Sequence, residues 1–172
     1  GKVRDVSFAV HRGEGLGFSG LMGAGRTELA RLIFGADRKE SGRVLMDGQQ
    51  VDVSSPRDAI ARGICLLTED RKAQGLVLGA TVRDNFALSN LKRWSRFGWI
   101  DRHVEQSRFV SLVAKLNIKI SSEDQRAEEL SGGNQQKLLV ARWLETNSQV
   151  VIFDEPTRGI DVGAKFEIYT IM

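Results

Sequence analysis

A glycine-rich segment near the start of the sequence has the spacing of a phosphate-binding loop. Its letters, GLMGAGRT, fit the pattern GxxxxGK[ST] except that Arg26 stands in place of the lysine. Glycine lets main-chain N–H groups turn toward phosphate oxygens, the helix that follows adds its positive end, and the Thr27 hydroxyl suits Mg²⁺. The alternative is a turn that only joins a strand to a helix. The candidate phosphate-binding residues are Gly20, Leu21, Met22, Gly23, Ala24, Gly25, Arg26 and Thr27.

A second glycine pattern, GxGxxG, overlaps this loop at Gly15, Gly17 and Gly20. In dinucleotide-binding proteins such a fingerprint lies between a strand and a helix. Here Leu16 and Phe18 belong to the predicted strand itself, and the helix begins only near residue 26. We therefore expect a chance match.

Two adjacent carboxylates, Asp154 and Glu155, follow the apolar run VVIF. The carboxyl ends of parallel strands are where open α/β sheets bind ligands, and a phosphate loop lies at the same edge. One carboxylate can hold Mg²⁺ while its neighbour polarises water, and Pro156 ends the strand so that both can face one cleft. The alternative is a solvated acidic turn. The phosphate loop makes hydrolytic chemistry the better hypothesis.

These residues need a folded domain, and the composition allows one. The chain has 172 residues, 41% hydrophobic and 27% charged, with a net charge of +3. It has no apolar run near the roughly 20 residues that span a bilayer, so any membrane association would be peripheral. The single cysteine, Cys65, lies in the apolar run ICLL. It is predicted to be a core residue, in a protein that works in a reducing compartment.

The spacing of apolar residues along the chain predicts the elements that position the candidate residues. VVIF, apolar on both faces, is predicted to be a central parallel strand covered by helices. The final helical pattern runs to Met172 without a cap, so we expect the domain to continue. Strands are predicted at 7–10, 16–19, 64–67 and 150–153, a short β region at 43–53, and helices from 26, 55, 134 and 162, with a helical insert at 81–129.

Three motifs in order, GLMGAGRT, LSGGNQQK and VVIFDEPTRGID, closely resemble the ATP-binding cassette (ABC) family. The details TEDRK, QGLVLG and DEPTRGIDVGAK look like the second cassette of ribose- and galactose-type monosaccharide importers. The resemblance implies an α/β fold, a P-loop NTPase core with a mainly parallel sheet, a small antiparallel β region and a helical subdomain. It divides one incomplete domain, 1–172, into a nucleotide-binding core at 1–80 and 130–172 and a helical subdomain at 81–129.

The resemblance also implies a role for each motif residue in binding ATP and Mg²⁺. Thr27 and Asp154 would serve the metal, and Glu155 would be the general base for attacking water. Ser131, Gly132 and Gly133 would present a helix N-terminus to the γ-phosphate held by another cassette, because family members pair head to tail. Asp161 would lie at that shared interface.

Two departures from the family pattern affect this cassette's own site. Arg26 keeps the charge of the usual lysine, but its planar fork cannot occupy the same point between phosphates. Glu69 stands where the family has a glutamine that contacts the nucleotide site. Because the signature LSGG is unchanged, we expect this half to complete the partner's active site while its own site turns over poorly.

The predicted function is ATP hydrolysis that powers monosaccharide import. The implied partners are a second cassette, transmembrane permease subunits and, indirectly, a periplasmic sugar-binding protein; the implied location is peripheral, at the cytoplasmic face of the inner membrane. A soluble cassette ATPase of translation or DNA maintenance is the alternative, and a nearly inert binding module a third reading.

One further segment, LKRWSRFGW, interleaves basic residues with aromatics. That composition suits nucleic acid or a lipid surface. We favour a helix end that docks its aromatics on its own subdomain over contact with a membrane partner, and expect no nucleic acid.

Overall fold

The computed structural model describes residues 3–172, and its contacts divide the chain into two units, Gly1–Arg62 and Gly63–Met172. We call them the N-terminal and C-terminal units and describe each by itself. The fold is α/β, as predicted. The N-terminal unit contains α1 (Arg26–Ile33), β1 (Val44–Met46), β2 (Gln49–Val51) and α2 (Pro56–Ala61).

Local sequence signals account for the elements of the N-terminal unit. β1 and β2 form an antiparallel hairpin, which confirms the predicted short β region, and its turn contains Asp47 and Gly48, both at positive φ. α2 begins as predicted: Ser55 caps it by accepting a hydrogen bond from the Asp58 N–H at 3.2 Å, and Pro56 occupies the first turn.

The strands predicted at 7–10 and 16–19 are wrong, because the structure shows no regular strand in either segment. The rings of Phe8 and Phe18 meet edge to face with centroids 5.0 Å apart, yet both side chains stay about half exposed. An alternating pattern forms a strand only where a hydrogen-bonded neighbour is available. Within residues 3–62, the ladder that the structure describes is that of β1 and β2.

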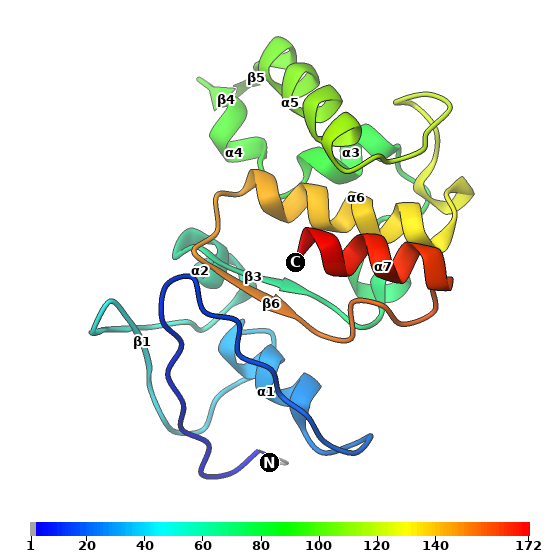
Figure 1. Cartoon of the computed structure of the whole chain (residues 1–172). Helices are drawn as coiled ribbons and strands as arrows, with labels where there is room; N and C mark the ends of the chain where they lie inside the picture. Colours follow the sequence, from blue (N-terminus) through cyan, green and yellow to red (C-terminus); the bar gives the residue numbers. More distant parts are fainter. Residues whose placement is uncertain (1–2) are drawn as a thin grey trace. The chain divides into compact units, whose positions relative to one another are not determined.

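The C-terminal unit contains a two-stranded parallel sheet with helices against it. Figure 1 shows β3 and β6 side by side and α7 running along α6, with α5 beyond α6. Its elements are β3 (Ile64–Leu67), a π-helical turn (Arg71–Gly75), α3 (Val82–Ala87), α4 (Leu91–Trp94), β4 (Ser95–Arg96), β5 (Trp99–Ile100), α5 (Arg102–Lys115), a 3₁₀ turn (Ala127–Glu129), α6 (Gly132–Glu145), β6 (Val150–Phe153) and α7 (Val162–Ile171).

Helix α6 forms the core of the C-terminal unit. Most of its side chains are buried, and Leu138 and Leu139 are fully enclosed. Its buried Lys137 pairs with Glu167 of α7 at 2.6 Å and donates to the Asn117 carbonyl at 3.0 Å, so this cation is compensated. The helix that carries the predicted signature is therefore held from several sides.

The run VVIF forms a parallel strand, as predicted, but it is not a central strand covered on both faces. β6 runs parallel to β3 as predicted, but the two form a two-stranded sheet in the part of the chain that is described. Val150 and Val151 are each 38% exposed, so β6 is not covered on both faces. The strand buried along its whole length is β3. An apolar run predicts a tendency toward burial without specifying the number of neighbouring strands.

Cys65 lies in β3 and is fully buried, as predicted. Burial raises the pKa of its thiol to about 11, with a weaker opposing contribution from a hydrogen bond to Ser148. A thiol with that pKa carries almost no thiolate near neutral pH, so Cys65 is a core residue and not a nucleophile.

Candidate functional site

The glycine-rich loop of the N-terminal unit leads directly into α1, as the pattern predicted. Gly23 and Gly25 have φ values of 82° and 93°, a left-handed conformation that glycine adopts without strain. An added Cβ at Gly20 would come within 3.3 Å of the Ala24 Cβ, so the loop folds back on itself. The Leu21 and Met22 side chains are 86% and 96% exposed. The loop therefore presents an open surface at the start of α1.

The start of α1 suits an anion. Within the loop, the Ala24 N–H is already used, because it donates to the Leu21 carbonyl at 3.0 Å and closes a turn. Arg26 and Thr27 are the first two residues of α1, and both are half-buried. The positive end of the helix and the arginine charge thus lie at the same place. The GxGxxG pattern does not lie directly before a helix, as a dinucleotide fingerprint must, because α1 begins only at Arg26.

The acidic pair lies directly after β6 in the C-terminal unit. The Asp154 N–H donates to the Leu67 carbonyl of β3 at 2.9 Å, and its side chain is 7% exposed. Glu155 is exposed and has a φ of 47°, which non-glycine residues rarely adopt. The left-handed residue breaks the strand alternation at this point. Strained backbone of this kind is common at functional sites.

The signature residues form the beginning of α6. The Ser131 hydroxyl caps the helix and accepts hydrogen bonds from the N–H and side-chain amide of Asn134, at 3.4 and 3.1 Å. Gly133 is buried, and a Cβ there would lie 2.6 Å from the Ala164 Cβ of α7. Glycine is thus required at this position because two helix ends approach closely.

Asp161, predicted at an interface between cassettes, caps α7 in this structure. Its Oδ1 accepts a hydrogen bond from the Ala164 N–H at 2.8 Å, and its Oδ2 lies 3.9 Å from a Cβ built on Gly133. Asp161 therefore positions the start of α7 against the start of α6. Its predicted contact with another cassette stays a prediction.

Glu69 contacts a residue that the sequence analysis missed. Its carboxylate forms an ion pair with the guanidinium of Arg158, in the loop between β6 and α7. Two residues on, the buried Arg71 donates to the carbonyls of Arg158 and Gly159 at 2.8 and 3.2 Å, and to the Gln135 side chain of α6 at 3.3 Å. Burial lowers the pKa of Arg71.

These contacts fasten the segment TEDRK to the loop before α7 and to the start of α6. The arginine of TEDRK and the glutamine after LSGG are visible in the sequence. Local spacing, however, does not indicate that residues so far apart in the chain are in contact. In the C-terminal unit, Glu69 thus contacts the loop before α7, and Asp161 separately caps α7 close to Gly133 of the signature. The phosphate loop belongs to the N-terminal unit, and its meeting with Asp154 and Glu155 in a single site stays a prediction.

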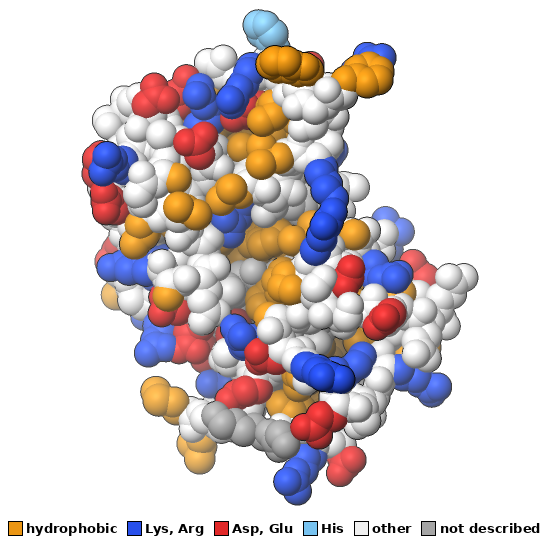
Figure 2. Space-filling model, turned by 180° about the vertical axis from the view of Figure 1, so that it is seen from behind, with side chains coloured by type: hydrophobic (Ala, Val, Ile, Leu, Met, Phe, Trp, Pro, Cys, Tyr) orange, Lys and Arg blue, Asp and Glu red, His pale blue; other side chains and the backbone are white. Residues whose placement is uncertain are grey.

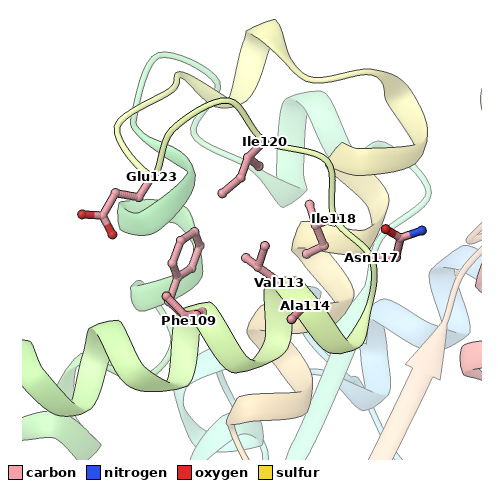
Figure 3. A pocket seen from close by; sticks show the side chains of 8 residues that line it. Phe109, Val113, Ala114, Asn117, Ile118, Ile120 and Glu123 are labelled. Carbon is pink, nitrogen blue, oxygen red and sulfur yellow. The ribbon is translucent and has the colours of Figure 1, made fainter.

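A mostly apolar pocket of about 420 Å³ lies in the predicted helical insert. Figure 3 shows Phe109 and Val113 of α5 pointing toward the loop that carries Ile118 and Ile120. Val110, which also lines the pocket, is 56% exposed. This surface lies on α5, away from the motif residues in sequence.

A glycine loop at the start of a helix, a parallel sheet and an acidic strand end define a P-loop type of α/β protein. Residues 3–158 match the family described as ABC transporter, and the chain belongs to that family. It is similar, with a TM-score of 0.82 and 20% identity over 99% of this chain and 72% of the other, to an ATP-binding cassette solved as a dimer with ADP and Pi. A nucleotide-free cassette aligns with a TM-score of 0.70 at 21% identity, over 88% of this chain and 61% of the other.

Two curated relatives are much closer in sequence. A ribose import ATP-binding protein of Halalkalibacterium halodurans is 51% identical over 100% of this chain and 34% of its own length. A putative ribose/galactose/methyl galactoside import ATP-binding protein of Albidiferax ferrireducens is 53% identical over 99% of this chain and 34% of its own. The chain thus spans about a third of the length of these relatives. Within residues 3–172, no helix has the length and apolar character to cross a membrane.

Proposed function

We propose that this chain is the second ATP-binding cassette of a subunit that hydrolyses ATP to power the import of a monosaccharide of the ribose type. The observation that carries the proposal is the 51% identity, over the whole chain, to a ribose import ATP-binding protein. The conformation of the glycine loop at the start of α1 supports it independently, because that geometry suits a nucleotide phosphate.

The motif residues would divide the work of the nucleotide site. Main-chain groups of Gly20–Thr27 would hold the phosphates, the Thr27 hydroxyl and the Asp154 carboxylate would hold Mg²⁺, and Glu155 would orient the attacking water. A hydroxyl and a carboxylate are oxygen ligands, and proteins usually bind Mg²⁺ through one or two such side chains together with substrate phosphates and water.

The cassette's own site would turn over slowly. Arg26 replaces the compact ammonium of lysine, and the Glu69 carboxylate is paired with Arg158, which supports a structural use of the position where the family has glutamine. The signature Ser131, Gly132 and Gly133 keeps a capped helix N-terminus. This half would therefore complete the site of a partner cassette more than its own.

The pocket on α5 would receive the permease. Its apolar lining and the partly exposed Val110 support contact with a protein segment, since an apolar groove on a soluble surface is a typical docking site. The chain would then sit at the cytoplasmic face of the inner membrane, and a periplasmic sugar-binding protein would act on the opposite side.

Val110→Asp is expected to uncouple the assembled transporter. A buried carboxylate without a partner opposes docking, and we expect sugar-stimulated ATP hydrolysis to fall about tenfold or more with little change in thermal stability, because Val110 is exposed in the chain alone. The measurement is the ATPase rate of reconstituted permease complexes. Leu144→Asp on α6, also exposed but outside the pocket, is the matched control. Normal coupling in the Val110 variant would refute the docking role.

A further inference from the structure

The hairpin formed by β4 and β5 presents two aromatic side chains to solvent. Phe97 is 90% exposed and Trp99 is 82% exposed. The third aromatic of the same segment, Trp94, behaves differently: it is 5% exposed and stacks on Phe86 with ring centroids 5.5 Å apart. Docking on the chain's own subdomain, the reading favoured from the sequence, is thus confirmed for Trp94 and wrong for Phe97 and Trp99.

The backbone at the tip is unfavourable for a phenylalanine. Phe97 and Gly98 have φ values of 52° and 84°, so both central positions of this two-residue turn are left-handed. Asn, Asp and Gly are the residues that such turns favour, and a bulky aromatic is strained there. Neither turn stability nor solubility explains an exposed phenylalanine at this position. A contact that the tip makes with something else would explain it.

The surroundings of the tip are basic. Residues 91–103 contain four basic residues and one acidic residue. Arg102 pairs with Glu105 at 2.7 Å and Arg93 lies 3.9 Å from a carboxylate oxygen of Glu145, so the positive charge available near the tip is that of Lys92 and Arg96. The Arg96 guanidinium lies 5.6 Å from the centre of the Phe97 ring. The one carboxylate, Asp101, is used as a cap and accepts hydrogen bonds from the N–H groups of His103 and Val104, both at 3.1 Å.

Hydrogen bonds hold the base of the hairpin. The Asp101 N–H donates to the Trp94 carbonyl at 2.9 Å, and the Ser95 hydroxyl donates to the Leu91 carbonyl at 2.5 Å. Arg93 donates to the carbonyl of Glu145 at the end of α6. These hydrogen bonds therefore fix the position of the hairpin that carries the exposed Phe97 and Trp99. Figure 2 shows hydrophobic side chains protruding beside basic ones at this end of the molecule.

We propose that this hairpin tip is a contact site for the surface of an anionic lipid bilayer. Aromatic rings favour the headgroup level of a membrane, and adjacent arginine and lysine side chains are attracted to anionic headgroups. A protruding tip suits a surface that yields to insertion, whereas single-stranded nucleic acid is usually bound along a groove. The contact goes beyond the proposed function, because it needs no nucleotide and no permease.

Tryptophan fluorescence of the 172-residue chain tests the proposal directly. The chain contains three tryptophans, and Trp94 and Trp143 are buried, so Trp99 reports on the tip. With phosphatidylcholine vesicles that contain phosphatidylglycerol, we expect a blue shift of the emission that weakens as salt is added. Phe97→Asn introduces a residue that this turn favours and leaves the Trp99 reporter in place, and we expect it to weaken vesicle binding by about fivefold or more.

Two further variants complete the test. Trp99→Phe should remove most of the spectral change while vesicle sedimentation still detects binding. Phe166→Ala, which removes an aromatic on α7 that is 74% exposed, should leave vesicle binding unchanged. Thermal melting shows whether each variant is folded, and we expect Phe97→Asn to melt no lower than the natural chain. An unchanged spectrum with anionic vesicles, an equal shift with phosphatidylcholine alone, or a shift that appears only with permease protein would each overturn the proposal.

Discussion

Ser131→Asp is expected to lower ATP hydrolysis by the assembled transporter about 100- to 1,000-fold. Aspartate caps a helix as well as serine does, so α6 should still begin at Gly132. The new carboxylate, however, would face the γ-phosphate that a partner cassette presents to the signature. Two like charges about 4 Å apart repel by about 4 kcal/mol at the effective dielectric of a protein surface, which sets the expected range.

Two variants separate this effect from loss of structure or loss of the chain's own site. Ser131→Asn also caps the helix but is neutral, and we expect it to retain activity within about tenfold of the natural protein. Glu155→Gln removes the proposed base of the cassette's own site, and we expect a loss of less than about threefold, because Arg26 and Glu69 already weaken that site. The measurement is steady-state phosphate release. A severe loss in Glu155→Gln together with a mild one in Ser131→Asp would reverse the assignment.

Gly133→Ala is expected to destabilise the C-terminal unit by about 1–3 kcal/mol. Alanine favours a helix over glycine by about 1 kcal/mol, yet the added Cβ would lie only 2.6 Å from the Ala164 Cβ. The start of α7 cannot slide away easily, because Asp161 holds the Ala164 N–H at 2.8 Å. Overpacking therefore outweighs helix propensity. Urea denaturation followed by circular dichroism measures the change.

A second-site change should reverse much of this loss. Ala164→Gly removes the methyl group that clashes, so the double variant should recover stability relative to Gly133→Ala in a double-mutant cycle. Gly163→Ala is the matched control, because its Cβ would meet only the Asp161 Oδ1 at 3.4 Å. We expect that control to be neutral or slightly stabilising. Additive effects of the two substitutions would show that the close approach of the helices does not limit stability.

The sequence alone predicted the elements that depend on local signals. Ser55 and Pro56 marked the start of α2, the glycine loop marked the start of α1, and LSGG marked the start of α6. Capping residues, proline and glycine act within one turn, so their effect is visible in a short window of sequence. The parallel direction of β6 and the burial of Cys65 also followed from short apolar runs.

Features that depend on distant partners were not predicted. The alternating segments at 7–10 and 16–19 have the pattern of strands but do not form them, and β6 is less covered than its composition suggested. The Glu69–Arg158 ion pair and the Arg71 hydrogen bonds join residues far apart in the chain. Spacing carries no information about such pairs. The β4–β5 hairpin was missed because strands of two residues have no detectable period.

Binding of MgATP to this chain is the most direct test of the central claim that the glycine loop holds a nucleotide's phosphates. Asp and Asn tolerate the left-handed backbone of Gly23 better than other non-glycine residues do, and the structure leaves open space around a Cβ at this position. The two variants are Gly23→Asp and Gly23→Asn. In equilibrium titrations with a fluorescent ATP analogue, we expect measurable binding by the natural chain, retention within about threefold in Gly23→Asn, and a loss of about tenfold or more in Gly23→Asp. Equal affinities for all three chains, or no binding by the natural chain, would contradict the account.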